Sequence, residues 1–138
     1  MIFPGISLLA LIVSALVAMA LGFAWYSNTL FGKKWRSLSG ISDATLKKMN
    51  THMPQRLGVA LIATLIMVYV LALALYALGA DTFMLGAIVG FWIWLGFVVP
   101  IMLGSVLWEG KHHNFYLINV LHYLVIFILV GGILGWWI

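Results

Sequence analysis

Two polar side chains in the last apolar stretch of the chain are the residues best suited to chemistry. Asn119 and His122 stand three positions apart in LINVLHYLVI, residues 117–126, and therefore share one face of a helix. An unpaired amide or imidazole is costly in hydrocarbon, so we expect both to face protein. They form either a buried polar clasp that fixes helix rotation or a ligand, proton or metal site. Candidate partners at similar depth include Tyr26 and Ser27.

A second group of chemically capable residues lies in WEGKHHN, residues 108–114. Glu109, His112 and His113 could converge with His52, and carboxylate and imidazole groups are zinc ligands. Loop histidines beside basic residues are usually solvated, however, so they are only weak metal candidates. The chain has no cysteine and shows no nucleophile elbow, phosphate loop or metalloprotease helix. We therefore assign no cofactor, no metal and no catalytic residue.

The composition determines which elements must hold these residues. The 138 residues are 65% hydrophobic and only 7% charged, whereas soluble domains have roughly 45–50% and about 25%. The mean hydropathy is +1.17. So short a soluble chain could hardly bury this much apolar surface, whereas a bilayer accepts it on the outside of the molecule. We expect one membrane domain over residues 1–138.

Four apolar stretches each reach the roughly 20 residues that cross a bilayer as a helix. They cover residues 5–26, 57–79, 82–108 and 115–137. None alternates in polarity as a transmembrane strand would. The predicted fold is an all-α, integral membrane four-helix bundle. The third stretch is too long to stand upright, and Pro100 is expected to bend it.

The positive charges all fall in the first and third connections between these helices. They are Lys33, Lys34, Arg36, Lys47, Lys48, Arg56 and Lys111. Because cytoplasmic loops are enriched in lysine and arginine, the pattern predicts that both basic loops are cytoplasmic and both termini are outside.

The connection over residues 28–56 is amphipathic as well as basic. An apolar stripe that includes Phe31 and Trp35 ends at Gly40, and a second short helix is expected after Ser42. Both should lie along the inner membrane surface near anionic lipid headgroups. The surface candidates are Lys33, Lys34, Trp35, Arg36, Lys47 and Lys48. The positive-inside rule already accounts for these cations, so no nucleic-acid partner is expected.

Small residues mark where helices can approach closely in a membrane. Three stripes occur, at Ser14, Ala18 and Gly22, at Gly86 and Gly90, and at Gly131 and Gly135. They pack either within the bundle or at an interface with a second copy or another membrane protein.

The segment GFAWYSNTLFGKKWRSLSGIS, residues 22–42, resembles the opening motif of an uncharacterised bacterial membrane family, domain of unknown function 1761. Residues 108–137 resemble that family's last hairpin. The matching positions are Trp25, Tyr26, Ser27, Leu30, Phe31, Gly32, Lys33 or Lys34, Trp35, Glu109, Asn119 and His122. The resemblance implies a small four-span protein of the bacterial cytoplasmic (inner) membrane whose motif residues share one neighbourhood. It implies no activity.

The leading functional interpretation is therefore a non-catalytic membrane protein that acts by assembly, as a homo-oligomer or an accessory subunit. The alternative is a carrier or channel-like bundle for a small solute, with Asn119, His122 and Glu109 lining an inner-facing cavity. A third interpretation is a lipid- or quinone-handling enzyme that uses His122 as an acid or base.

Overall fold

A computed structural model describes residues 5–138, and every regular element in that range is helical. The elements in chain order are α1 (Leu8–Trp25), α2 (Gly32–Ser39), α3 (Asp43–Thr51), α4 (Met53–Leu78), α5 (Phe83–Ile93), the π-helix η1 (Trp94–Val98), α6 (Val99–Met102), α7 (Gly104–Leu107) and α8 (His113–Trp137). Four helical stretches are long and apolar enough to cross a membrane: α1, α4, the run from α5 to α7, and α8. The predicted all-α bundle of four spans is confirmed, and the chain is a multi-pass membrane protein.

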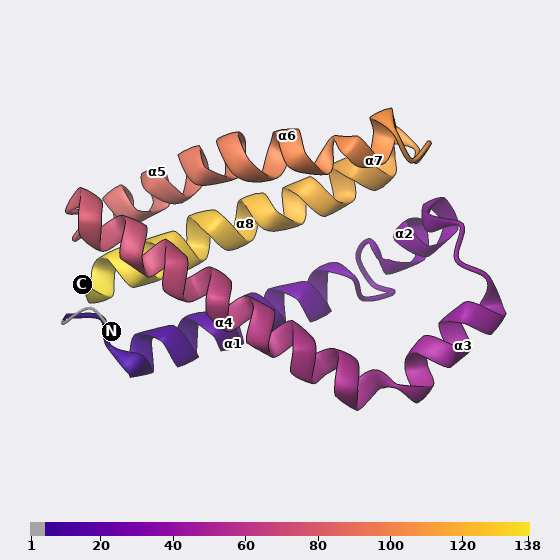
Figure 1. Ribbon diagram of the computed structural model, residues 1–138, viewed down its shortest axis with the longest axis horizontal. Coiled ribbons are helices and arrows are strands. Elements are labelled where there is room, and N and C mark those ends of the chain that lie inside the picture. The colour runs from indigo at the N-terminus through magenta and orange to yellow at the C-terminus, as the bar shows by residue number, and fades with distance from the viewer. Residues whose placement is uncertain (1–4) are drawn as a thin grey trace.

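The spans place the connections at two opposite ends of the bundle (Figure 1). The start of α1, the turn between α4 and α5 and the C-terminus lie at one end, called here the terminal end. Helices α2 and α3 and the turn between α7 and α8 lie at the other, called the loop end. All seven lysine and arginine residues belong to segments at the loop end. The two basic connections also touch, because the Lys111 Nζ donates to the Ser39 carbonyl at 2.6 Å.

The span boundaries differ from the predicted ones by a few residues. The largest difference is at α4, which begins at Met53 rather than at residue 57, so that Arg56 lies in its first turn. A proline in that first turn explains the early start, since its missing N–H has no helical partner there and its φ suits a helix. Helix α1 begins one residue after Ser7, whose hydroxyl accepts from the Ala10 N–H at 3.3 Å.

The third span is interrupted where the sequence predicted a bend. Its middle is a π-helix, in which the Val99 N–H donates to the Trp94 carbonyl five residues earlier. Pro100 follows directly and cannot donate a helical hydrogen bond. A widened turn beside a proline is one way to relieve the crowding of its ring.

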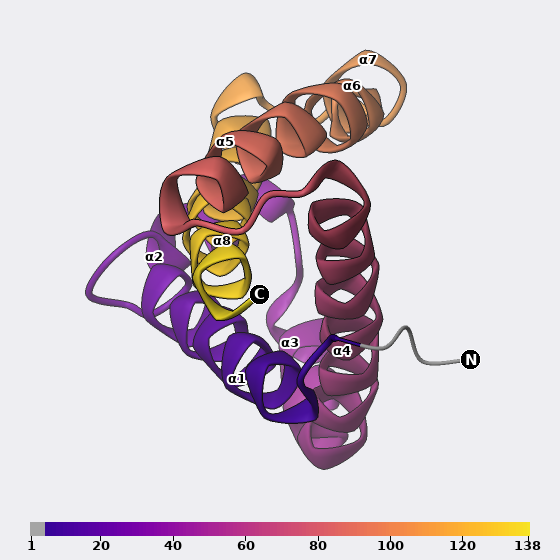
Figure 2. The same cartoon turned by 90° about the vertical axis from the view of Figure 1, so that its left-hand side faces the viewer.

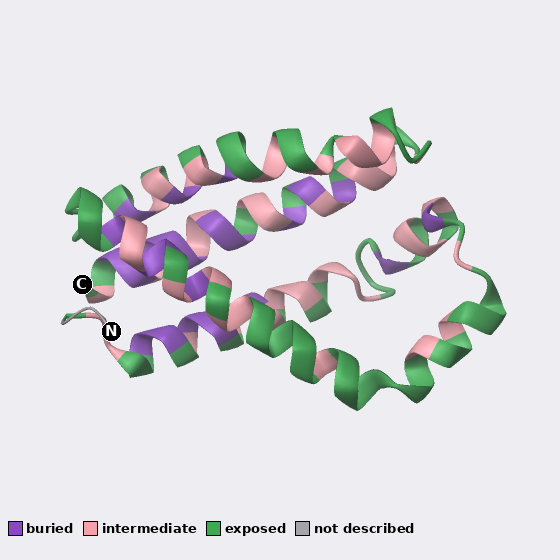
Figure 3. Cartoon of the chain, viewed as in Figure 1, coloured by how far each residue is buried: buried purple, intermediate pink, exposed green. Residues whose placement is uncertain are grey.

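Helices α5 and α8 are in backbone contact. A Cβ atom added to Gly86 would overlap the Gly131 carbonyl, and one added to Gly90 would overlap the Phe127 carbonyl. Gly135 is similarly tight, with an added Cβ 3.0 Å from the Gly86 Cα. Two of the predicted small-residue stripes therefore pack against each other inside the chain. Figure 3 shows α8 as the most buried of the long helices.

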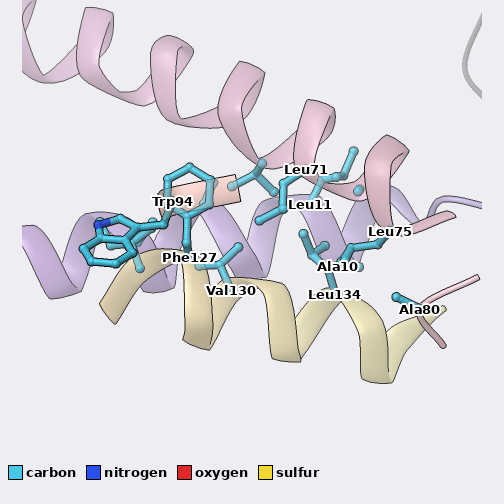
Figure 4. Packing of buried hydrophobic residues seen from close by; sticks show 14 of the residues in the cluster. Ala10, Leu11, Leu71, Leu75, Ala80, Trp94, Phe127, Val130 and Leu134 are labelled. Atoms are coloured by element: carbon cyan, nitrogen blue, oxygen red, sulfur yellow. The ribbon is translucent and has the colours of Figure 1, made fainter. Parts of the chain in front are cut away.

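Helix α4 joins the core only over its half near the terminal end. Its buried residues are Val68, Leu71, Ala72 and Leu75, and none before Val68 is buried. Leu71 and Leu75 pack near Leu11 and Leu134 in the core (Figure 4). Toward the loop end, α4 diverges from α1 (Figure 1), and viewed from the terminal end it stands apart on one side of the bundle (Figure 2). This divergence creates the space in which the candidate site lies.

The loop-end connection forms the two expected short helices. Helix α2 ends at Gly40, which has a left-handed φ of 73°, and α3 starts after Ser42, whose hydroxyl accepts from the Thr45 N–H at 3.2 Å. Helix α2 packs against α8, whereas α3 has no buried residue. The connection is therefore docked at α2 and loosely held at α3.

Candidate ligand cavity beside His122

Asn119 lies at the centre of a hydrogen-bonded cluster that joins three helices. Its Oδ1 accepts from the Tyr26 hydroxyl at 2.6 Å and from the Trp35 indole N–H at 3.0 Å. Tyr26 stands directly after α1, and Trp35 belongs to α2. The expected partnership of Asn119 with Tyr26 is present. Both bonds use the same oxygen, so the Asn119 side chain ties α1 and α2 to α8.

Trp35, which the sequence placed among the membrane-surface residues, also packs against α8. In the structure it is half-buried, and its ring stacks on Phe115 at 5.9 Å between centroids. The same phenyl ring lies 5.5 Å from the Lys111 ammonium. Trp35 is therefore the residue by which α2 docks on α8. The sequence carried a signal for this: Trp35 belongs to the apolar stripe, and an indole N–H buried at an interface requires an acceptor.

Three more aromatic side chains bond to backbone carbonyls around the same region. The Trp25 indole donates to the Ile118 carbonyl at 2.9 Å, and the Trp94 indole to the Val120 carbonyl at 2.7 Å. The Tyr116 hydroxyl donates to the Val99 carbonyl at 2.9 Å, next to Pro100. These bonds fix α1 and the bent third span against α8. Sequence reasoning missed Trp94 and Tyr116, since a carbonyl acceptor leaves no mark in the sequence.

The turn after α1 explains why glycine follows Phe31. The Gly32 N–H donates to the Ser27 carbonyl at 2.9 Å, and an added Cβ would overlap the Tyr26 carbonyl. The Ser27 hydroxyl donates to the Ala24 carbonyl at 2.7 Å. Ser27 and Gly32 therefore shape the turn that presents Tyr26 to Asn119, and Ser27 itself does not reach the polar cluster.

His122 differs from Asn119 because its ring nitrogens are unsatisfied. The residue is 8% exposed, and neither Nδ1 nor Nε2 has a hydrogen-bond partner among residues 5–138. The ring is surrounded by aromatic groups, with centroid distances of 5.0 Å to Tyr26 and 4.8 Å to Tyr123. Nε2 lies 3.5 Å from the place where a Cβ on Gly22 would stand. The missing side chain at Gly22 therefore leaves free space in front of Nε2.

A cavity of about 440 Å³ opens beside this imidazole. Helices α1, α4 and α8 form its wall, which consists of Ala18, Met19, Gly22, Phe23, Tyr26, Leu57, Ala60, Ala63, Thr64, Met67, His122, Tyr123 and Ile126. No charged residue contributes to it. The Thr64 hydroxyl donates a hydrogen bond to the Ala60 carbonyl at 2.7 Å. A mostly apolar cavity of this size with a few convergent polar groups is typical of a small-molecule site.

The first small-residue stripe, Ser14, Ala18 and Gly22, serves partly to pack the bundle and partly to line the cavity. Ser14 and Ala18 are buried in the bundle, and Gly22 faces His122. Within the described chain, the glycines of α5 and α8 thus pack on each other, whereas Ala18 and Gly22 of the first stripe also line the cavity.

Glu109 and the loop histidines do not join the site. Glu109 is exposed and, within residues 5–138, forms no hydrogen bond or ion pair. His112 caps α8, where its Nδ1 accepts from the Asn114 N–H at 3.1 Å, and its ring lies 4.1 Å from that of His113. No group of three metal-ligating residues occurs in the part of the chain that the structure describes, so His52, His112 and His113 do not form the weakly suggested metal site.

The basic side chains at the loop end lie outside the cavity. Lys33, Lys34, Lys47 and Lys48 are exposed, and the Arg36 guanidinium donates to the Asn28 side chain. They present positive charge around the end of the bundle at which the cavity lies.

Fold and site together define a small multi-pass membrane protein with an apolar, histidine-bearing cavity between its helices. A family model described as "Protein of unknown function (DUF1761)" matches residues 9–135, and the chain belongs to this family. The resemblance seen in the opening motif and the last hairpin is thereby confirmed. No curated protein and no solved structure gives a significant match.

Proposed function

We propose that this protein binds a small lipophilic molecule from the bilayer in the cavity beside His122. The observation that carries the proposal is a buried imidazole, with neither nitrogen paired, in the wall of a ligand-sized apolar cavity. A buried polar group without a partner costs about 1–3 kcal/mol. A ligand hydroxyl or carbonyl that pairs with Nε2 would offset this cost.

The apolar opening of the cavity supports the proposal that the ligand enters from the bilayer. The cavity lies between α1 and the half of α4 that has no buried residue, where the two helices diverge. Its rim there carries Phe23, Leu57 and Ala60, which are apolar. A molecule dissolved in the bilayer could therefore enter sideways without crossing a polar barrier.

This proposal differs from the other two interpretations in the observations that support it. Assembly with a second copy or another membrane protein remains a prediction, but the small-residue stripes no longer support it. The glycines of α5 and α8 pack on each other, and Gly22 faces His122. A solute carrier lined by Asn119, His122 and Glu109 loses two of its three residues, since neither Asn119 nor Glu109 belongs to the cavity wall. The Asn119 Oδ1 accepts from Tyr26 and Trp35, and Glu109 is exposed. Catalysis by His122 would need a second reactive group, and the cavity wall offers only the hydroxyls of Tyr26, Thr64 and Tyr123. The first two already donate, to the Asn119 side chain and the Ala60 carbonyl.

We further propose that the loop end faces the cytoplasm of a bacterial inner membrane, with both termini outside. All lysine and arginine residues belong to loop-end segments, as the positive-inside rule requires of a cytoplasmic face. The exposed lysines of α2 and α3 would then lie near anionic lipid headgroups, each with an attraction of about 1 kcal/mol.

The test of binding is saturable labelling by a photoreactive long-chain alcohol in nanodiscs. Gly22→Leu, which fills the space in front of Nε2, is the blocking variant. Ala20→Leu adds the same side chain at an exposed position of α1 and is the matched control. We expect excess unlabelled alcohol to suppress labelling of the wild type and of Ala20→Leu, with Gly22→Leu labelled weakly and not saturably. Equal labelling of all three proteins would refute the proposed site.

A further inference from the structure

A second cavity of about 320 Å³ lies on the other side of α4 from the α1 opening. Its wall consists of Met67, Phe97, Val98, Met102, Tyr123 and Phe127. Phe97 and Val98 come from the π-helix η1, and Met102 ends α6. The cavity thus lies between α4, α8 and the bent part of the third span. Aside from the tyrosine hydroxyl, its side chains are apolar.

Two residues are common to both cavities. Met67 of α4 and Tyr123 of α8 line the His122 cavity and the second cavity alike, and both are half-buried. The two spaces therefore adjoin at these side chains. Methionine is unbranched and flexible, so a change of the Met67 side-chain rotamer would join the two cavities between α4 and α8.

The position of α4 explains why the space continues on both of its sides. No residue of α4 before Val68 is buried, and Leu65 and Met67 pack against the core only in part. Space therefore remains on the α1 side and on the π-helix side of α4.

We infer that the two cavities are the two ends of one elongated site, and that its ligand is a single-chain amphiphile with a neutral, hydrogen-bonding head group. This inference rests on the proposed function. The head group pairs with His122 Nε2, and the alkyl chain passes Met67 and Tyr123 to end against Phe97, Val98 and Met102. Fatty alcohols and monoacylglycerols have this chemistry.

The polarity of the walls determines the neutral head group. Neither cavity has a lysine, arginine, aspartate or glutamate in its wall. A charged group at this depth is costly without a partner, whereas a hydroxyl can both donate to and accept from an imidazole in either tautomer. The second cavity offers only one hydroxyl among hydrocarbon and thioether groups, which suits an alkyl chain.

Two photoreactive long-chain alcohols test the inference, one with a diazirine beside the hydroxyl and one with a diazirine near the chain end. Labelled peptides of the protein in nanodiscs are identified by mass spectrometry, with excess unlabelled alcohol as competitor. We expect the first probe to label residues of the His122 cavity and the second to label Phe97, Val98 or Met102, both saturably. Met102→Trp should reduce labelling by the chain-end probe at least tenfold and leave labelling by the probe with the diazirine beside the hydroxyl unchanged. Ile101→Trp places the same bulk on the exposed neighbouring residue and should change neither.

The outcomes separate this inference from the proposed function. Saturable labelling by the first probe, with chain-end labelling that is diffuse or insensitive to competitor, would overturn the elongated site and leave binding at His122 intact. Absence of saturable labelling by either probe would overturn both. Chain-end labelling that Met102→Trp and Ile101→Trp reduce equally would also overturn the elongated site, because it would place the chain on the outer surface of α6.

Discussion

Replacing Asn119 with leucine should release α2 from α8, and the size of the effect follows from the hydrogen bonds it breaks. The Trp35 indole N–H would lose its acceptor, as would the Tyr26 hydroxyl. Hydrogen bonds between helices in membrane proteins average about 0.6 kcal/mol and reach about 1.7 kcal/mol. Of the two lost bonds, only the Trp35 bond involves α2, and the Lys111–Ser39 bond and the Trp35–Phe115 stacking remain. The free energy of α2 docking should therefore fall by the value of that one bond. This corresponds to an increase of about 3- to 20-fold in the population of undocked α2, at 1.36 kcal/mol per factor of ten.

Cysteine reactivity measures that population directly, because the chain has no native cysteine. Ser39 is 5% exposed at the end of α2, so Ser39→Cys reports each opening by reacting with a water-soluble maleimide. The reaction rate of Ser39→Cys should rise about 3- to 20-fold in the Asn119→Leu background. Asn114→Leu is the control, since the Asn114 side-chain amide forms no hydrogen bond within residues 5–138.

A double-mutant cycle identifies the bond responsible. Trp35→Phe removes the same hydrogen bond from the other side, so it should accelerate labelling similarly, and the double variant should be no faster than the more reactive single variant. Unchanged reactivity of Ser39→Cys in Asn119→Leu would refute the claim that this amide docks α2. Strictly additive effects would show that Asn119 and Trp35 act independently.

The remaining predictions concern packing, topology and the unpaired imidazole. Gly86→Ala forces backbone apart at the α5–α8 contact and should lower the free energy of unfolding by about 1–3 kcal/mol in denaturation experiments, whereas Gly96→Ala, in open space, should have little effect. In intact cells, an impermeant maleimide should label Asp81→Cys, and Thr45→Cys only after permeabilisation; the reverse pattern would invert the proposed orientation. His122→Phe should raise the ligand-free thermal stability, by about 1 kcal/mol, because it removes an unsatisfied buried group, and a loss of stability would instead identify His122 as part of a structural clasp.

The sequence predicted the global architecture because the membrane imposes simple requirements on composition. Four long apolar stretches admit only helices, so the fold class and the order of the spans were confirmed with shifts of a few residues. Gly40 and Ser42 were equally informative about α2 and α3, since a left-handed residue and a hydroxyl cap are local signals. A proline at position 100 predicted a bend but not its form, because a π-helix depends on how the turn packs against α8.

The site was harder to predict, because its properties depend on distances between helices. Asn119 and His122 looked equivalent in the sequence, yet the Asn119 Oδ1 accepts two hydrogen bonds and neither His122 nitrogen has a partner. The difference lies in Gly22 and in the divergence of α4, and neither has a local sequence signature for a cavity. Glu109 was predicted near them from its place at a span end, but the turn after Trp108 directs it to solvent.

Helix α4 is anchored in the core from Val68 onward, so its other half can pivot about that residue. Before that point α4 has no buried residue: Leu65 and Met67 pack against the core only in part, and the preceding helix α3 has no buried residue either. A small rotation about Val68 moves Leu57 much farther than Met67. The cavity therefore changes width more near Leu57 than near Met67. A sideways push on α3 from the surrounding headgroups would consequently alter how readily the space beside His122 fills or empties, without disturbing the glycine contacts that hold α5 to α8.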